Sequence, residues 1–214
     1  MDQLLIALDV ESGAQALGLA DTLRGRVGGF KIGNRLFTAE GPVMVRTLVA
    51  RGDRVFLDLK FHDIPNTVAT AVSAATSLGA WMINVHASGG LRMMQAAAEA
   101  ARTTAAAEGR QPPLIIGVTV LTSMSAGVLA DVGVQAPILE QVGRLARLAQ
   151  QAGLDGVVAS PQETNVVRGL CGPDFAIVTP GIRGGAAASG KDDQERTMTA
   201  GAAIAAGASY LVVG

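Results

Sequence analysis

Residues 56–68, FLDLKFHDIPNTV, contain charged side chains inside a segment that otherwise has the composition of a buried strand. Asp58 and Lys60 are two residues apart, so on a β-strand they point to the same side. Asp63 follows at the strand exit, and Lys31 lies in a neighbouring apolar segment. We expect these four side chains to form an alternating row of cations and anions. Because an opposite charge within ~4–6 Å favours the ionised form, we predict that Lys60 is a charged proton donor rather than a neutral base or a Schiff-base nucleophile.

Short apolar segments alternate with segments of helical composition along the whole chain. Strands are expected at 4–10, 28–33, 54–60, 81–87, 114–121, 155–160, 175–181 and 209–214. Helices are expected at 12–25, 38–51, 66–78, 89–108, 136–152, 161–170 and 195–207. Strands that are apolar on both faces and separated by crossover helices are typical of a parallel sheet. Eight such units predict one (β/α)8 TIM barrel over residues 1–214.

An open, doubly wound sheet is the alternative fold. It is disfavoured because neither a Gly-x-Gly-x-x-Gly nor a Walker fingerprint follows the first expected strand. In a (β/α)8 barrel the catalytic groups lie at the carboxyl ends of the strands. The polar residues expected there are Asp9, Lys31, Asp58, Lys60, Asp63, Asn84, His86, Thr119, Thr122, Thr179 and Arg183.

A buried salt-bridge network that only specifies the barrel is the structural interpretation of this cluster. Four charges at the catalytic end are more than the control of strand register requires, so we favour a catalytic role. His86 is expected to be a structural histidine that forms hydrogen bonds, and His62 is given no catalytic role.

The composition excludes several classes of partner. A net charge of −1 and an aromatic content of 3 % argue against a basic or base-stacking surface for nucleic acid. Cys171 is the one cysteine and cannot form an internal disulfide, which fits a reducing, cytoplasmic compartment. The N-terminal segment lacks a basic region, and no apolar run is long enough to span a bilayer. We therefore expect a cytoplasmic protein with a small-molecule partner, and neither nucleic acid nor membrane.

The segment DLKFHDIPNTV resembles the Asp-x-Lys-x-x-Asp-Ile-Pro-Asn-Thr signature of the orotidine 5′-phosphate decarboxylase family. Asp-x-Lys-x-x-Asp alone is shared by a wider group of sugar-phosphate barrels, but DIPNT, VLTSM and PGIR together favour this family. The resemblance extends in order through ALDV at 7–10, FKIG at 30–33, NVHASGG at 84–90, VTVLTSM at 118–124, GLDGVVAS at 153–160, VTPGIR at 178–183 and DDQERTMT at 192–199.

The resemblance implies a (β/α)8 barrel, usually a homodimer with shared active sites. The implied reaction is the decarboxylation of orotidine monophosphate to UMP, the last step of de novo pyrimidine synthesis, with no metal and no organic cofactor. Lys60 would then protonate C6, and Asp58 would face the substrate carboxylate. Asp63 and Thr67 would reach the active site of the partner subunit.

The remaining implied contacts hold the substrate. Asp9 and Lys31 would bind the ribose, and Thr122 would contact the pyrimidine. Arg183 and Gln194 would bind the phosphate, with Gln194 on a Gly- and Ala-rich loop, 181–194, that closes over the substrate. In the family an arginine follows the glycine of the eighth strand and binds the phosphate. Here Gly214 is the last residue, so its amide is the expected contact and we expect a longer natural chain.

Two other functions remain open at this point. One is a Mg²⁺-dependent lyase or aldolase on the same barrel that acts on a ketose phosphate. It would need a carboxylate ligand on the second strand, where this chain has Lys31 and Gly33. The other is a non-enzymatic nucleotide-binding barrel, which would not need the full set Asp58, Lys60 and Asp63.

Overall fold

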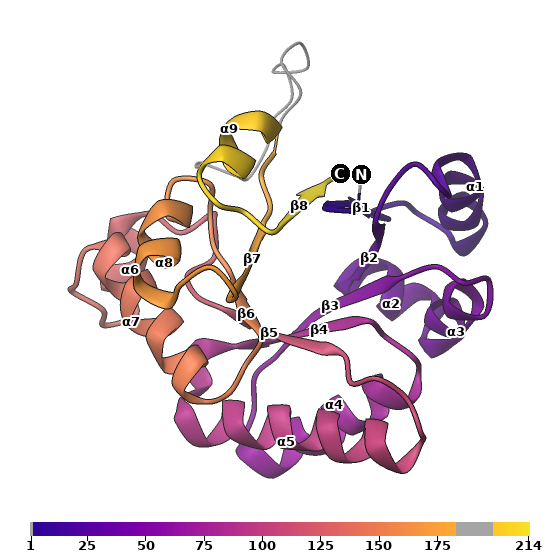
Figure 1. Cartoon of the computed structure of the whole chain (residues 1–214), viewed down its shortest axis with the longest axis horizontal. Helices are drawn as coiled ribbons and strands as arrows, with labels where there is room; N and C mark the ends of the chain where they lie inside the picture. The colour runs from indigo at the N-terminus through magenta and orange to yellow at the C-terminus, as the bar shows by residue number, and fades with distance from the viewer. Residues whose placement is uncertain (1, 183–198) are drawn as a thin grey trace.

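A computed structural model describes residues 2–182 and 199–214 and shows a closed barrel of parallel strands in sequence order. Its last strand pairs with its first, with Leu5 opposite Val212, and this pairing closes the sheet. Helices lie around the outside of the strands (Figure 1). The (β/α)8 prediction is therefore confirmed. The strands are β1 (Leu4–Ala7), β2 (Gly29–Gly33), β3 (Val55–Phe61), β4 (Met82–His86), β5 (Leu114–Val118), β6 (Gly156–Val158), β7 (Ala176–Thr179) and β8 (Tyr210–Val213).

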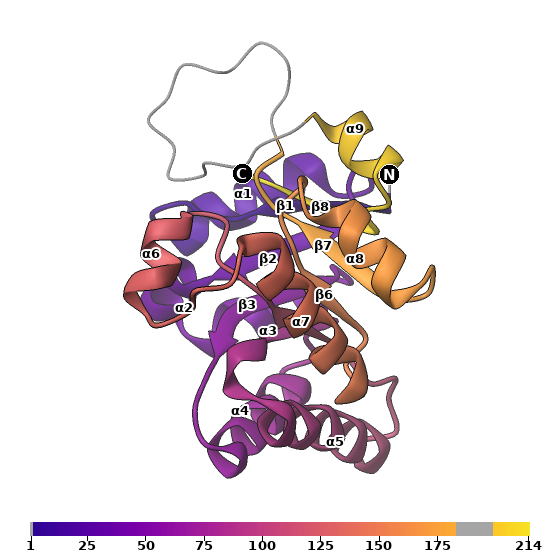
Figure 2. The same cartoon turned by 90° about the vertical axis from the view of Figure 1, so that its left-hand side faces the viewer.

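The helical layer follows the strands in alternation. Its members are α1 (Gly13–Leu23), α2 (Asn34–Glu40), α3 (Pro42–Ala50), α4 (Pro65–Ser77), the 3-10 turn η1 (Ala87–Gly89), α5 (Leu91–Ala107), α6 (Ala126–Asp131), α7 (Ile138–Gln151), α8 (Thr164–Cys171) and α9 (Ala200–Ala205). Helices α4 and α5 pack against each other below β3, β4 and β5 (Figures 1 and 2). None of the helices within 2–182 and 199–214 is both long and apolar enough to cross a bilayer.

One helix prediction was wrong and one helix was missed, both for reasons of local chain chemistry. The single helix expected at 38–51 is two helices, because Gly41 adopts a left-handed φ of 65° and Pro42 starts a new helix. Helix α6 was not predicted, although Ser125 caps it by accepting a hydrogen bond from the Val128 N–H.

Several strands are shorter than predicted. β1 ends at Ala7, so Asp9 lies on the loop beyond this strand rather than on the strand, and β5 ends at Val118, so that Thr122 lies further along the following loop than predicted. Because these strands are short, the residues that follow them lie outside the regular pairing of the sheet. These loops therefore hold polar side chains at the carboxyl end of the barrel, where Figure 2 also shows α6.

The apolar core has two layers. The barrel interior contains side chains from six strands, namely Leu5, Ala7, Phe56, Met82, Ile116, Val178 and Val212. A second layer between strands and helices includes Phe30, Ile32, Leu57 and Ile83, which are almost fully buried. Burial of one such side chain contributes about 1.5–3 kcal/mol relative to its exposure. The strands are thus apolar on both faces because each face has its own layer to fill.

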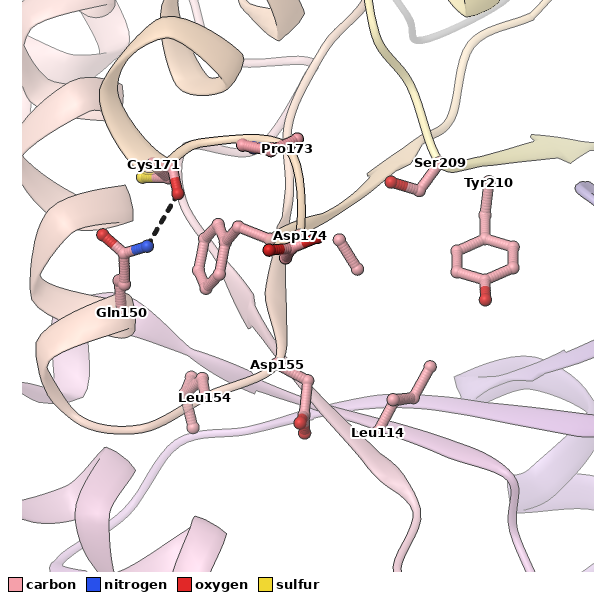
Figure 3. Close-up of a pocket in the computed structure, with 11 residues that line it drawn as sticks. Leu114, Gln150, Leu154, Asp155, Cys171, Pro173, Asp174, Ser209 and Tyr210 are labelled. Carbon is pink, nitrogen blue, oxygen red and sulfur yellow. Dashed lines mark hydrogen bonds between the residues drawn. The ribbon is translucent and has the colours of Figure 1, made fainter.

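The amino end of the barrel contains a cavity of about 600 Å³ where β5 to β8 begin (Figure 3). Its polar groups bind parts of the chain itself. The Asp155 carboxylate accepts a hydrogen bond from the Ile115 N–H at 2.7 Å, and Gln150 donates to the Cys171 carbonyl at 2.8 Å. Burial raises the pKa of the Asp155 carboxyl. The polar groups at this end of the barrel therefore bind backbone groups near the ends of strands and helices.

Arg168 on α8 connects several segments of the chain at this amino end. Its guanidinium donates to the backbone carbonyls of Gly172 at 2.6 Å, Phe175 at 2.8 Å and Gly207 at 2.7 Å. These carbonyls belong to the segments that lead into β7 and β8. Hydrogen bonds from a charged donor contribute about 1.5–3 kcal/mol each, and they are not additive. Arg168 therefore stabilises the fold far from the candidate chemistry.

We expect Arg168→Ala to lower the free energy of unfolding by about 2–4 kcal/mol, because several carbonyls lose their donor. Chemical denaturation would measure the change. Arg144→Ala is the matched control, since Arg144 is exposed and its partner among the described residues is Glu140 one turn away, and it should cost less than about 0.5 kcal/mol. Equal effects of the two substitutions would contradict the role given to Arg168.

Candidate active site

Four charged side chains form a continuous row at the carboxyl end of the first three strands. Lys60 Nζ lies 2.7 Å from Asp58 Oδ1, and Lys31 Nζ lies 3.4 Å from Asp58 Oδ2. Lys31 Nζ also lies 3.4 Å from Asp9 Oδ1. We call these residues, Asp9, Lys31, Asp58 and Lys60, the charge row. Three members of the predicted row are thus adjacent, and Asp9 extends it at the β1 end.

Strand register brings the row together. Ala7 of β1 is opposite Lys31 of β2, and Gly33 of β2 is opposite Asp58 of β3. A Cβ atom at Gly33 would lie 3.0 Å from Lys31 Nζ, which is tighter than nine in ten real contacts of a Cβ atom, so glycine leaves room for the ammonium group. A side chain at this position would require the Lys31 ammonium to shift.

Exposure increases outward from the middle of the row. The side chains of Lys31 and Asp58 are each 11 % exposed, whereas those of Lys60 and Asp9 are 31 % and 55 % exposed. The row thus has a buried ion pair at its centre and a more accessible group at each end. A ligand at this end of the barrel can reach the Lys60 ammonium and the Asp9 carboxylate.

The central carboxylate is held ionised. Burial alone would raise the pKa of Asp58, but the positive charges of Lys31 and Lys60 lower it, aided by hydrogen bonds from Lys60 and Asn84. The pKa of Asp58 therefore lies below its ordinary value. Because the folded-state pKa is the lower one, ionised Asp58 stabilises the fold above the unfolded pKa of about 3.9. That contribution is lost as the pH falls through the folded-state pKa.

The backbone at Lys60 departs from a regular strand. Lys60 has a φ of 53°, and the β3–β4 register shifts between Leu57 and Phe61. Opposite this irregularity, Asn84 Oδ1 accepts a hydrogen bond from the Lys60 N–H at 2.8 Å. Asn84 Nδ2 donates to Asp58 Oδ1 at 2.6 Å. The prediction that Asp58 and Lys60 share a side is confirmed, but a bulge rather than a regular pleat achieves it.

His86, at the end of β4, lies beside the row. Its ring centroid is 5.3 Å from that of His62, with the rings tilted by 37°. Its pKa is lowered by burial, by the neighbouring His62 and by the positive charge of Lys60, against the opposing effect of Asp58. In the described part of the chain its side chain contacts a second imidazole instead of forming the hydrogen bond that the sequence suggested.

The other predicted site residues lie around the row without joining it. Asp63 is exposed, and its Oδ1 accepts a hydrogen bond from the Ile64 N–H at 2.6 Å. Thr67 is exposed in the first turn of α4, and Thr122 is half-buried in the loop after β5. At Gly214 an added Cβ would lie 3.7 Å from Asp9 Oδ2, so this glycine is next to the row.

Two predicted phosphate contacts cannot be compared with the geometry. Arg183 and Gln194 lie outside the described residues, as do residues 183–194 of the predicted closing loop at 181–194. Among the described residues, no group of three His, Cys, Asp or Glu side chains is arranged to hold a metal ion.

Sequence reasoning missed the part played by Asn84. The residue was recognised as polar at a strand end, but its partners were not. The available signal was an amide two residues before His86, on the strand that neighbours Asp58 and Lys60. A side chain with both a donor and an acceptor is suited to a position between a backbone N–H and a carboxylate.

Comparison with known proteins gives a consistent result over the whole chain. The family model described as "Orotidine 5'-phosphate decarboxylase / HUMPS family" matches residues 2–214. The orotidine 5′-phosphate decarboxylase of Syntrophotalea carbinolica is 58 % identical over 99 % of this chain and 86 % of its own length. The enzyme of the same name from Moorella thermoacetica is 54 % identical over 100 % of this chain and 84 % of its own length.

A solved structure agrees with these sequence relatives. The crystal structure of orotidine 5′-phosphate decarboxylase from Lactobacillus acidophilus aligns with a TM-score of 0.87 and 36 % identity. The alignment covers 99 % of this chain and 89 % of the other. The barrel and its order of strands are therefore shared with a protein of this type.

We expect Lys31→Met to raise the pKa of Asp58, because the variant removes the larger of two Coulombic contributions and leaves the effect of burial. A carbon-13 NMR titration of labelled aspartate carboxyls would measure the change. Arg35→Met is the control, since it removes a positive charge from the exposed pair with Glu11. A pKa of Asp58 that is unchanged or lower in Lys31→Met would contradict the proposed electrostatics.

Proposed function

Because the chain belongs to the orotidine 5′-phosphate decarboxylase / HUMPS family, we propose that its charge row decarboxylates orotidine 5′-monophosphate to UMP and CO2. This reaction is the last step of de novo pyrimidine nucleotide synthesis, and no metal or organic cofactor takes part in the proposal. The observation that carries it is the accessible Lys60 ammonium, 2.7 Å from a buried carboxylate at the carboxyl end of the barrel.

The chemistry requires a fixed cation. Loss of CO2 from C6 of the pyrimidine leaves an electron pair in an sp2 orbital, with little resonance stabilisation. An ammonium group held beside C6 stabilises this developing charge before any proton moves. Lys60 then transfers a proton to C6, which forms the C6–H bond of UMP and leaves a neutral amine. That amine regains a proton from water before the next turnover.

Asp58 has two effects in this proposal. It holds the Lys60 ammonium in place through the 2.7 Å ion pair. It also lies beside the departing carboxylate, and two unit charges ~4 Å apart repel by about 4 kcal/mol at an effective dielectric constant near 20. That repulsion is released as CO2 leaves. It is too small for a large rate acceleration by itself, so binding of the ribose and phosphate must contribute the rest.

The remaining substrate contacts are assigned from where the other predicted site residues lie. Asp9 and Lys31 bind the ribose hydroxyls, which is supported by the exposed Asp9 carboxylate at the edge of the row. Thr122 contacts the pyrimidine from the loop after β5. Gly214 contributes its amide to the phosphate beside Asp9. Arg183 and Gln194 complete the phosphate contacts on sequence resemblance alone.

The functional unit in this proposal is a homodimer with shared active sites. Asp63 and Thr67 are exposed at the start of α4, and Ile64 between them is 67 % exposed. One exposed apolar side chain does not by itself mark an interface, so the dimer is proposed from the family resemblance. In that dimer Asp63 would extend toward the Lys60 of the second subunit, and the alternating row would be completed across the interface. A reducing cytoplasmic compartment is consistent with the single Cys171.

Conversion of orotidine monophosphate to UMP is followed directly by the change in ultraviolet absorbance, with EDTA present. We expect wild-type protein to turn over and Lys60→Ala to lose at least about 100- to 1000-fold in kcat, because the transition-state charge loses its cation. Arg144→Ala removes an exposed charge elsewhere and should retain wild-type kcat. No turnover by the wild-type chain would refute the assignment, and a requirement for added Mg²⁺ would favour the metal-dependent lyase.

Shared sites are tested by mixing two inactive variants. Lys60→Ala and Asp63→Asn subunits, unfolded together and refolded, should recover about a quarter of wild-type activity. In a symmetric dimer, half of the molecules would be hybrids with one intact site. Each variant refolded alone provides the baseline. Sites built within one subunit would give no recovery above that baseline.

A further inference from the structure

We propose that Asn84 is a positioning residue for the decarboxylation: its amide holds the Lys60 backbone in a left-handed conformation and fixes the Asp58 carboxylate. The inference rests on the proposed function, because it concerns the geometry of the same charge row. Asn84 itself is 1 % exposed and acts through Lys60 and Asp58.

The strand pairing shows where positioning is needed. Leu57 is opposite Ile83, and Phe61 is opposite Val85. Three residues of β3, from 58 to 60, therefore face the single residue Asn84 on β4. Such a bulge interrupts the ladder and leaves backbone groups without their usual partners. The Lys60 N–H is one of these groups, and the Asn84 side chain takes the place of the missing ladder carbonyl.

The left-handed conformation of Lys60 requires stabilising contacts from other residues. Among the described residues, Lys60 is the one non-glycine residue with a positive φ. A left-handed conformation is unfavourable for an L-residue, because it brings Cβ too close to the following carbonyl oxygen. It persists only where the surroundings determine it. The 2.8 Å bond from the Lys60 N–H to Asn84 Oδ1 is a contact that directly favours this conformation.

The two hydrogen-bond partners of residue 84 favour an amide side chain at this position. One side of Asn84 faces a donor, the Lys60 N–H, and the other side faces an acceptor, the Asp58 carboxylate. A carboxamide has an oxygen acceptor and a nitrogen donor on the same carbon. One orientation of the amide satisfies both partners, and the flipped orientation satisfies neither. An ionised aspartate would repel Asp58, and leucine would offer neither group.

The contacts form a closed circuit. Asp58 Oδ1 accepts from Asn84 Nδ2 at 2.6 Å and from Lys60 Nζ at 2.7 Å. Lys60 is thus bound to Asn84 through its backbone and to Asp58 through its side chain. Asp58 Oδ2 remains directed to Lys31, 3.4 Å away. Loss of the amide frees both the backbone of Lys60 and one oxygen of Asp58, so the ammonium loses its fixed position.

Misplacement of a reacting group by about 1 Å can lower a rate by about 100-fold. We therefore expect Asn84→Leu to lower kcat by about 100-fold while KM changes by less than about fivefold, because Asn84 does not touch the substrate. Thr76→Val is the matched control. Thr76 is also buried, and its hydroxyl donates to the Val72 carbonyl at 2.8 Å within α4. This control should keep wild-type kcat.

Asn84→Asp provides a readout that a purely structural role would not change. Among the described residues, the titratable groups near this position are Asp58 and Lys60 on β3, Lys31 on β2, His86 on β4 and His62, whose ring centroid is 5.3 Å from that of His86. When the introduced carboxyl group is protonated, it can donate to Asp58 and accept from the Lys60 N–H, as the amide does. When it is ionised, it repels Asp58. The ratio of variant to wild-type kcat should therefore rise as the pH falls from about 8.5 to about 5.5.

Amide hydrogen exchange separates this inference from the proposed function. The Lys60 N–H should exchange faster in Asn84→Leu than in wild type, whether or not the protein acts on orotidine monophosphate. Exchange at Lys60 should be unchanged in Thr76→Val. If Asn84→Asp has a kcat ratio that does not vary with pH, and both Asn84 variants retain kcat within about threefold, the positioning role is wrong. If Asn84→Leu does not fold, the pH profile of Asn84→Asp decides the question.

Discussion

The charge row depends on the buried anion Asp58, which lies between two ammonium groups. Removal of a carboxylate from water is costly unless charge and hydrogen bonds compensate for the lost hydration. Lys31, Lys60 and Asn84 supply that compensation from three adjacent strands. The same contacts that make the anion tolerable also fix the direction of the Lys60 ammonium. Stability of the strand end and geometry of the reaction centre are therefore two results of one arrangement.

The barrel separates two physical tasks between its ends. At the amino end, Arg168 and Asp155 form hydrogen bonds with backbone groups of the chain itself, so their charges stabilise contacts between segments of the fold. At the carboxyl end, short strands release loops that present Asp9 and Thr122. The apolar layers between these ends keep the two sets of polar groups apart. Changes at the amino end can therefore alter stability without altering the candidate reaction centre.

The sequence predicted the barrel because the periodicity of apolar residues carries that information directly. It also predicted that Lys31, Asp58 and Lys60 would meet, since neighbouring parallel strands end at the same edge. It could not predict the left-handed backbone at Lys60, because lysine has no intrinsic preference for that conformation and the cause lies on another strand. The role of Asn84 was missed for the same reason. The break at Gly41 and Pro42 was readable in principle, but helical composition on both sides hid it.

The pairing of β8 with β1 also has a consequence for biosynthesis. β1 leaves the ribosome early, yet its outer edge finds its partner only after Tyr210–Val213 have been made. At about 5–20 residues per second, about 10–40 s pass between these events. During that time β1 has an unpaired edge that can associate with other chains. The pairing of β1 with β2 and of β2 with β3 needs no later segment, so the part of the sheet that holds Lys31 and Asp58, with Asp9 on the loop after β1, can assemble before the ring is complete.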